Sequence, residues 1–166
     1  MGIIHTPPEP LGPDHDLSNF DCGEIVLNDW LIKRALRNHL EGASRTYVIA
    51  VDKVVVAYYC LAAGSVDSEI APGKVKRNMP DPIPVIVLGR LAVDLRHQKA
   101  GLGKGLIKDA YLRTLNAAEL VSARALLVHA LHDNAKSFYE RCGFIASPIQ
   151  PRTLMLPIKD IRTAIA

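Results

Sequence analysis

The chain has few aromatic residues, few cysteines and no long hydrophobic run. Aromatic side chains make up 5% of its 166 residues, so the core must be packed mainly with Leu, Val, Ile and Ala. The three cysteines lie far apart without a CxxC pair, which argues against a zinc site, a redox motif or a disulfide framework. The longest uncharged apolar run, residues 54–64, is too short to span a bilayer. Because no basic and apolar leader opens the chain, we expect a soluble, cytoplasmic protein.

What the chain does contain is typical of one compact domain. Hydrophobic residues make up 49% and charged residues 22% of the sequence, as in ordinary globular proteins. A chain of this length corresponds to about one domain, and we expect residues 1–166 to form it.

The charge is unevenly distributed, although the net charge is only +3. Residues 1–30 carry six acids and no Lys or Arg, whereas residues 31–46 carry four bases and one acid. Residues 72–114 carry nine bases and three acids. If the two basic stretches meet in space, they form a surface that could hold a polyanion; otherwise they are solvated helix faces.

The hydrophobic pattern predicts alternating helices and strands. In chain order it predicts a helix over 24–40 ended by Gly42, a hairpin of strands 46–51 and 54–61 turning at Asp52-Lys53, a loop over 66–84, a strand over 85–93, a helix over 101–116, a strand over 123–131, a helix over 134–141 and two short strands within 144–157. Asn134 or Asp133 is expected to cap the helix over 134–141, and Gly143 to close it. This order indicates an α/β fold with a mixed, largely antiparallel central sheet flanked by helices.

The most informative segment joins the strand that ends at Asp94 to the helix after it. It reads Gln98-Lys-Ala-Gly101-Leu-Gly103-Lys-Gly105, with three glycines in five residues. Glycine lets the backbone approach a ligand closely, and the first N–H groups of a helix bind anions. The spacing matches neither the Walker pattern GxxxxGK[ST] nor the dinucleotide pattern GxGxxG. The segment therefore predicts an anion site of another kind.

The pattern Gln98-x-x-Gly101-x-Gly103 resembles the Q/R-x-x-G-x-G/A loop of the GNAT family of N-acetyltransferases, which binds the pyrophosphate of acetyl-CoA. The strand end Leu91-Ala-Val-Asp94 and the later segment Asn134-Ala-Lys-Ser-Phe-Tyr139-Glu-Arg-Cys-Gly-Phe144 also resemble this family. The resemblance implies the GNAT fold, acetyl-CoA as co-substrate and no metal. It assigns acetyl-CoA binding to Leu91, Ala92, Val93, Gln98, Lys99, Ala100, Gly101, Leu102, Gly103, Lys104, Gly105, Asn134, Ser137 and Tyr139.

Segments along nearly the whole chain resemble the acetyltransferase toxins of bacterial type II toxin–antitoxin modules. They include Phe20-Asp-Cys-Gly23, Asn28-Asp-Trp-Leu31, Arg34-Ala-Leu-Arg-Asn38, Ser44-Arg-Thr-Tyr-Val48, Leu61-Ala-Ala-Gly-Ser-Val66 and Gly89-Arg-Leu-Ala-Val-Asp94. Such toxins acetylate the free α-amino group of aminoacyl-tRNA and so block translation. The resemblance therefore implies a ribbon-helix-helix antitoxin that neutralises the enzyme. It also implies a homodimer, repression through operator DNA bound only by the toxin–antitoxin complex, and no membrane.

Acetyl transfer from a thioester needs a stabilised oxyanion and a proton for the leaving thiolate. The resemblance assigns the oxyanion to backbone N–H groups near residues 91–93 and the proton to Tyr139, the expected catalytic general acid. Because the reference pKa of tyrosine is ~10, Tyr139 is expected to be protonated at neutral pH.

The acceptor amine distinguishes the substrate classes. A lysine side chain with a pKa of ~10.4 is almost fully protonated at pH 7, whereas an α-amino group with a pKa of ~7.7–8.0 is already partly neutral. No pair of carboxylates accompanies the motif, which suits an aminoacyl ester better than lysine. Two alternatives stay open: an N-acetyltransferase of protein N-termini or small amines, and a degenerate module that only binds CoA.

Several cations are candidates for contact with the phosphates of the tRNA acceptor stem. They are Lys33, Arg34, Arg37, Arg45, Arg77, Arg90 and Arg96. Other residues have structural interpretations. Trp30 is expected to anchor the first helix in the core. His129 and His132 straddle a strand end and lack the Glu of a metalloprotease motif, so we assign them no metal.

Overall fold

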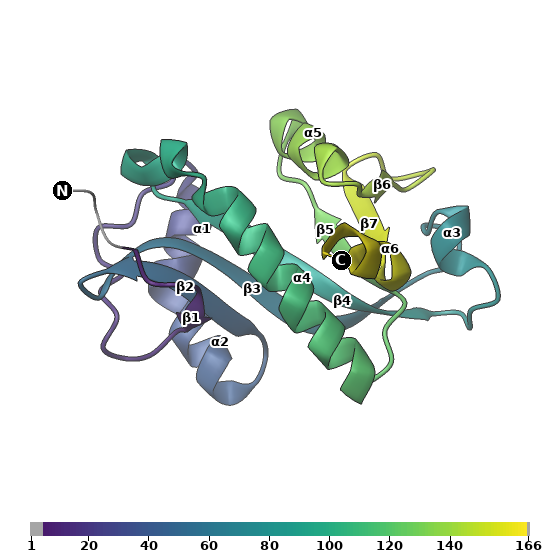
Figure 1. Ribbon diagram of the computed structural model, residues 1–166, viewed down its shortest axis with the longest axis horizontal. Helices are drawn as coiled ribbons and strands as arrows, with labels where there is room; N and C mark the ends of the chain where they lie inside the picture. Colours follow the sequence, from purple (N-terminus) through teal and green to yellow (C-terminus); the bar gives the residue numbers. More distant parts are fainter. Residues whose placement is uncertain (1–4, 166) are drawn as a thin grey trace. The chain divides into compact units, whose positions relative to one another are not determined.

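The computed structural model describes residues 5–165 (Figure 1). Their strands are β1 (Glu9–Pro10), β2 (Arg45–Val51), β3 (Val54–Val66), β4 (Ile83–Val93), β5 (Ala125–His129), β6 (Ile145–Ala146) and β7 (Thr153–Pro157). Their α-helices are α1 (Ile25–Trp30), α2 (Leu36–Glu41), α3 (Gly73–Lys76), α4 (Leu102–Leu120), α5 (Asp133–Arg141) and α6 (Ile158–Ile165). A π-helical segment η1 (Leu31–Ala35) joins α1 to α2, and a 3-10 helix η2 (Leu95–Ala100) precedes α4.

Two compact units divide the described chain. Unit 1 comprises the residues up to 62 together with 90–110, and unit 2 comprises 63–89 together with the residues from 111 onward. Strands β3 and β4 and helix α4 run through both units. The strand order is therefore β1-β2-β3-β4 in unit 1 and β3-β4-β5-β7-β6 in unit 2, which together make a seven-stranded sheet.

The sheet is mixed, as the sequence predicts. The pairs β1–β2, β2–β3, β5–β7 and β6–β7 are antiparallel. Strands β4 and β5 are parallel, from Val85 beside Ala125 to Leu88 beside Val128. The β2–β3 hairpin turns at Asp52 and Lys53, whose φ angles are 48° and 71°. Two successive positive φ angles are what a two-residue turn of type I′ requires, so the predicted hairpin is confirmed.

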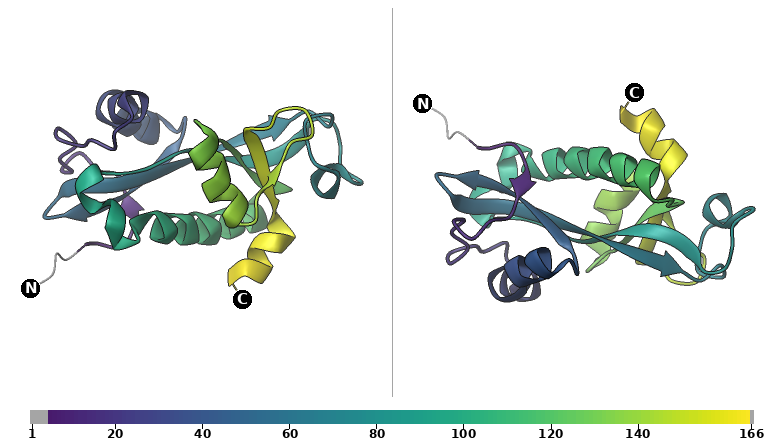
Figure 2. Two further views of the ribbon diagram at one scale, coloured as in Figure 1. Left: turned by 90° about the horizontal axis from the view of Figure 1, so that it is seen from above. Right: turned by 90° about the horizontal axis from the view of Figure 1, so that it is seen from below.

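In unit 1, the helical segment 25–41 covers one face of the strands and the first turns of α4 cover the other (Figure 2). Trp30 is only 8% exposed and stacks on Tyr58, with ring centroids 6.0 Å apart. The Tyr58 hydroxyl donates to the carbonyl of Leu27, which ties β3 to α1. Trp30 is thus the predicted core anchor. Gly42 ends the helix in the left-handed conformation, also as predicted.

In unit 2, helices α3, α5 and α6 all pack against β7 (Figure 1). The core cluster that includes Val75 of α3 consists of aliphatic side chains such as Val66 and Leu127, together with Met155. Gly64 near the end of β3 has no room for a side chain, because a Cβ there would lie 2.8 Å from Cγ2 of Val87. The sheet therefore requires glycine at position 64 because any larger residue would clash with Val87.

Some predicted elements differ from the observed ones. The predicted helix 24–40 contains the π-helical segment η1, which the apolar spacing did not reveal. The predicted helix 101–116 runs on to residue 120, and the predicted strand 123–131 shortens to Ala125–His129. Exposed Val121 and Ser122 lie in the linker between the two observed elements. Strand β1 and helices α3, η2 and α6 were not predicted.

The cap of α5 was predicted wrongly. The N-cap is His132, whose Nδ1 accepts a hydrogen bond from the backbone N–H of Ala135. Asp133 and Asn134 are the first two residues of the helix itself. An imidazole nitrogen supplies the same acceptor as an Asp or Asn side chain, so a preference for Asp or Asn as the cap placed it one or two residues too late. Gly143 follows the helix with a φ of 98°, as expected of a helix-closing glycine.

Candidate functional site

The glycine-rich segment forms the start of α4. The 3-10 helix η2 ends at Gly101, which adopts the left-handed conformation with a φ of 75°, and α4 begins at Leu102. Gly101, Lys104 and Gly105 are exposed at this end of the helix. The first four N–H groups of an α-helix have no partner within the helix, and the helix dipole adds positive potential. With Lys99 and Lys104 exposed nearby in sequence, these donors fit an anionic pyrophosphate.

A buried carboxylate holds η2 in place. The side chain of Asp94, at the end of β4, is 1% exposed and caps η2 by accepting from the backbone N–H of Arg96 at 2.9 Å. The Nε and Nη2 of Arg96 each donate to the same carboxylate at 2.9 Å. These hydrogen bonds hold the pKa of Asp94 down at about 2, against the opposing effect of burial. Asp94 is therefore a charged group at neutral pH inside the protein.

The N-terminal segment of unit 1 is fastened to the same carboxylate. The N–H of Asp21 donates to Asp94 at 3.1 Å, and the N–H of Leu95 donates back to the carbonyl of Asp21 at 2.8 Å. Asn28 of α1 completes the network, because its amide donates to the Asp21 carboxylate and accepts from the N–H of Cys22. Through these contacts α1 supports the segment that precedes α4.

Gln98 contributes to this scaffold as well. Its Nε2 donates to the carbonyl of Val93 at 3.1 Å and lies 3.5 Å from the carbonyl of Cys22. The side chain therefore joins η2 to the end of β4 and to the N-terminal segment. Sequence reasoning found Gln98 through its spacing to the glycines, but it gave Asp94, Asp21 and Asn28 no role beyond membership of segments that resemble the family. The available signal was the position of Asp94 immediately before a helix, where Asp is a preferred cap.

The remaining part of the predicted site belongs to unit 2. Tyr139 is buried on α5, where its ring makes edge-to-face contacts with Phe138 and Phe144 at centroid distances of 5.2 and 5.4 Å. Asn134 and Ser137, three residues apart on the same helix, are both exposed. Unit 1 holds the other predicted acetyl-CoA residues, which are Leu91, Ala92, Val93, Gln98, Lys99, Ala100, Gly101, Leu102, Gly103, Lys104 and Gly105.

Residues 42–146 match the family model of the acetyltransferase (GNAT) domain. That match covers more than half of the chain, including the glycine-rich segment and Tyr139. The chain belongs to the GNAT family. The mixed seven-stranded sheet agrees with this assignment and confirms the predicted fold class. GNAT proteins are acetyltransferases that use acetyl-CoA. The pyrophosphate of acetyl-CoA is an anion of the kind that the N–H donors at the start of α4 are expected to bind.

Relatives of this GNAT protein include toxins. The chain is 49% identical, over 97% of its length and 97% of the relative's, to a tRNA-acetylating toxin of Mycobacterium tuberculosis. It is 30% identical to AtaT complexed with acetyl-methionyl-tRNAfMet, with a TM-score of 0.89 over 98% of this chain and 100% of that one. It is 31% identical to a mutant AtaT toxin bound to acetyl-CoA and the C-terminus of the antitoxin AtaR. There the TM-score is 0.82, over 96% of this chain and 97% of the other.

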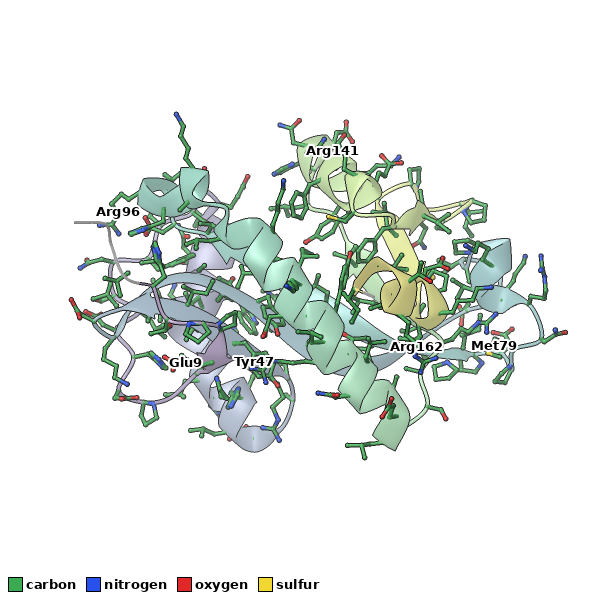
Figure 3. All side chains as sticks on the ribbon, in the orientation of Figure 1. Glu9, Tyr47, Met79, Arg96, Arg141 and Arg162 are labelled. Carbon is green, nitrogen blue, oxygen red and sulfur yellow. The ribbon has the colours of Figure 1, made fainter. Side chains whose placement is uncertain are left out.

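Two of the cations predicted to contact tRNA, Arg90 and Arg96, interact with buried side chains in unit 1 of the GNAT domain. The guanidinium of Arg90 lies over Trp30, 4.3 Å from the ring centroid. Arg96, labelled in Figure 3, donates to Asp94. The contact of Arg90 with Trp30 places part of the basic stretch 72–114 beside the basic helical segment 31–41, as the formation of one basic surface requires.

The other predicted cations are solvent-exposed. Lys33 and Arg37 form ion pairs with the acids four residues away, Asp29 and Glu41, and Arg45 donates to the carbonyl of His39. Exposed pairs of this kind are weak and leave the cation accessible to a polyanion. Arg34 of unit 1 and Arg77 of unit 2 are exposed as well.

The histidines and cysteines of the GNAT domain have structural contacts. Nδ1 of His129 lies 3.0 Å from Oγ1 of Thr153, and His132 caps α5. None of the three cysteines, all within the described residues, forms a disulfide. Within residues 5–165 no group of three or more His, Cys, Asp or Glu side chains is placed to hold a metal ion. No helix in that range has both the length and the apolar character needed to cross a membrane.

Proposed function

We propose that this chain is an acetyl-CoA-dependent N-acetyltransferase toxin that acetylates the α-amino group of aminoacyl-tRNA and so blocks translation. The observation that carries the proposal is the 49% identity, over nearly the full length of both chains, to a tRNA-acetylating toxin. The solvent-accessible start of α4 supports it from the structure, because a degenerate protein would have no need to keep this anion site.

We assign the donor site to the start of α4 in the following way. The N–H groups of the first turn and the ammonium groups of Lys99 and Lys104 bind the pyrophosphate of acetyl-CoA. Gln98 and Asp94 keep η2 in position, so these donors are preorganised before the ligand arrives. The backbone N–H groups of residues 91–93 stabilise the oxyanion that forms when the amine attacks the acetyl carbonyl.

Tyr139 is assigned the role of general acid. When the amine nitrogen bonds to the acetyl carbon, the carbon–sulfur bond breaks and the sulfur leaves as a thiolate. The Tyr139 hydroxyl donates its proton to that sulfur, the amine loses its own proton to solvent, and the tyrosinate regains a proton from solvent. An aminoacyl amine is neutral often enough near pH 7 to react without a dedicated protein base.

The partners follow from the same proposal. We propose that a ribbon-helix-helix antitoxin neutralises the enzyme and that their complex represses its operator. We also propose that the toxin forms a homodimer in the cytoplasm and that its two compact units act as one domain. Elements β3, β4 and α4 support the last point, because each runs through both units.

The proposed function is tested by transfer of labelled acetyl from acetyl-CoA to a pool of charged tRNA, with uncharged tRNA as control. Label on the charged pool only, released when the aminoacyl ester is hydrolysed, is the expected result. Transfer to free peptides or small amines but not to charged tRNA would instead identify a protein or small-amine acetyltransferase. Binding of acetyl-CoA without transfer to any amine would identify a degenerate binding module.

A further inference from the structure

Unit 2 contains a basic pocket that none of the predicted site residues lines. It has a volume of about 240 Å³ and lies where the end of α4, the linker into β5 and the start of α6 meet. Its lining includes three cations, Arg124, Lys159 and Arg162, together with the hydroxyl of Ser122 and no acidic residue. Figure 3 labels Arg162 on α6.

Arg124 is held rigidly at this pocket. Its Nε donates to the carbonyl of Val75 at 2.9 Å, and its Nη2 lies 2.9 and 3.5 Å from the carbonyls of Lys74 and Arg77. Lys74 and Val75 belong to α3 and Arg77 is its C-cap residue, so the guanidinium caps the end of that helix. Its Nη1 donates to no residue among those described. Arg124 is therefore ordered before a ligand binds, and its remaining N–H donors can bind the ligand with little further loss of side-chain entropy.

The charge around the pocket remains positive. Lys159 and Arg162 are exposed, lie three residues apart on α6 and form no ion pair within residues 5–165. Asp160, the acid between them, is bound by Lys74 at 2.8 Å. Glu119 is exposed at the end of α4 but does not line the pocket. Within residues 5–165, neither Asp160 nor Glu119 thus forms an ion pair with a lining cation.

We infer that this pocket binds a backbone phosphate of the tRNA substrate, an inference that rests on the proposed function. A guanidinium and an ammonium beside a hydroxyl match the acceptor oxygens of a phosphodiester. Through Arg124 the pocket adjoins the basic α3 segment, which carries the predicted tRNA contact Arg77. The apolar lining consists of Ala118, Ala123, Pro157 and Ile158, and it lacks the aromatic anchors that dominate protein–protein interfaces.

The inference is tested with the double variant Lys159→Ala/Arg162→Ala. Both side chains are exposed, so the variant is expected to fold, whereas replacing Arg124 would remove a helix cap. The matched control is Lys53→Ala/Arg152→Ala, which removes two exposed cations already paired with Asp14 and Asp133. Affinity for tRNA is measured by fluorescence anisotropy over a range of salt concentrations, and KM for charged tRNA is measured alongside.

The double variant is expected to bind tRNA about tenfold more weakly at low salt, with KM raised to match, because charge-assisted hydrogen bonds to phosphate are lost. The slope of log K against log salt should fall by about 0.8, the value for one phosphate contact. The control should change affinity by less than about twofold. Acetylation of an aminoacyl nucleotide, which lacks the tRNA body, should be unchanged in both variants.

Three results would overturn the inference. The first is a double variant that matches the control in affinity and salt slope while the wild-type protein acetylates charged tRNA, which leaves the proposed function intact. The second is loss of binding to inorganic phosphate alone, with tRNA affinity kept, which identifies a small phosphate metabolite as the ligand. The third is a wild-type protein that does not act on charged tRNA, which removes the proposed function and this inference together.

Discussion

Replacement of Asp94 is expected to destabilise the protein and to loosen the start of α4. In Asp94→Asn the side chain keeps its size but loses its charge and one acceptor oxygen. The native carboxylate accepts three hydrogen bonds from Arg96 and one from the N–H of Asp21, all between 2.9 and 3.1 Å. An amide places its own N–H groups against some of these donors, and this leaves buried donors unpaired.

The pKa of Asp94 gives the magnitude. It is lowered from 3.8 to about 2 in the folded protein. A difference of this size corresponds to about 2 kcal/mol of folding free energy when the group is ionised. Because the folded pKa is the lower of the two, this stability is fully present above pH 3.8 and is lost as the pH falls towards 2. At neutral pH the variant should therefore lose about 2–3 kcal/mol, including the cost of unpaired donors.

Urea unfolding at pH 7 and at several values between pH 2 and 5 measures this effect. The wild-type protein should lose stability over that acidic range, and the variant should show a smaller loss. Asp14→Asn is the control, because its ion pair with Lys53 is exposed and should contribute little. In enzyme assays KM for acetyl-CoA should rise in Asp94→Asn more than kcat falls, because the variant disturbs a support of the binding segment and no reacting group.

The reasoning would be refuted by an Asp94→Asn protein with wild-type stability at pH 7 and unchanged KM for acetyl-CoA. A loss of stability that does not depend on pH would refute the electrostatic part alone. In that case Asp94 would stabilise the protein through the packing of its side chain and not through its charge. The hydrogen bonds from Arg96 would then add no net stability.

Three further predictions concern single positions. Tyr139→Phe should lower kcat by about 10²–10⁴-fold while calorimetry shows unchanged affinity for acetyl-CoA, and a wild-type kcat would remove Tyr139 as general acid. Trp30→Ala should cost about 3–5 kcal/mol in urea unfolding, because it empties a buried site against Tyr58; a cost below about 1 kcal/mol would contradict that packing. Gly64→Ala should cost about 1–3 kcal/mol through the clash with Val87, and the second change Val87→Ala should recover most of it if the clash is the cause.

Elements with strong local signals could be predicted from the sequence. Asp52 and Lys53 lie between two β-rich runs, and Gly42 follows an apolar stripe of helical spacing, so both turns were found where they occur. Elements with weak local signals could not. Strand β1 is two residues long and contains Pro10, and only its pairing with Tyr47 and Val48 makes it a strand. Helix α6 has eight residues, and the residues before it, 154–157, include no Ser, Thr, Asp or Asn cap of the kind expected for α5.

The same division holds within the site. The glycine spacing after Gln98 is local, and it identified the start of α4 correctly. The network of Asp94 with Asp21 joins residues 73 positions apart, and no local pattern records such a pairing. Likewise the basic pocket is formed by Arg124 and Arg162, which come together only because β5 and β7 are neighbours in the sheet. Sequence reasoning therefore found residues that belong to one local motif. It did not find contacts between residues that are distant in the sequence and meet only in the folded protein.

The acidic N-terminal stretch illustrates what that difference means for function. As a run of six acids it suggests a surface that could attract a basic partner. In the structure, however, most of these acids have partners within unit 1: Glu9 binds His15, Asp14 binds Lys53 and Asp29 binds Lys33. Asp21 accepts hydrogen bonds from Gly23 and Asn28 and thereby supports η2. The acidic charge thus acts within the scaffold of unit 1, and the positive potential that the proposed binding of acetyl-CoA and tRNA needs comes from the exposed cations.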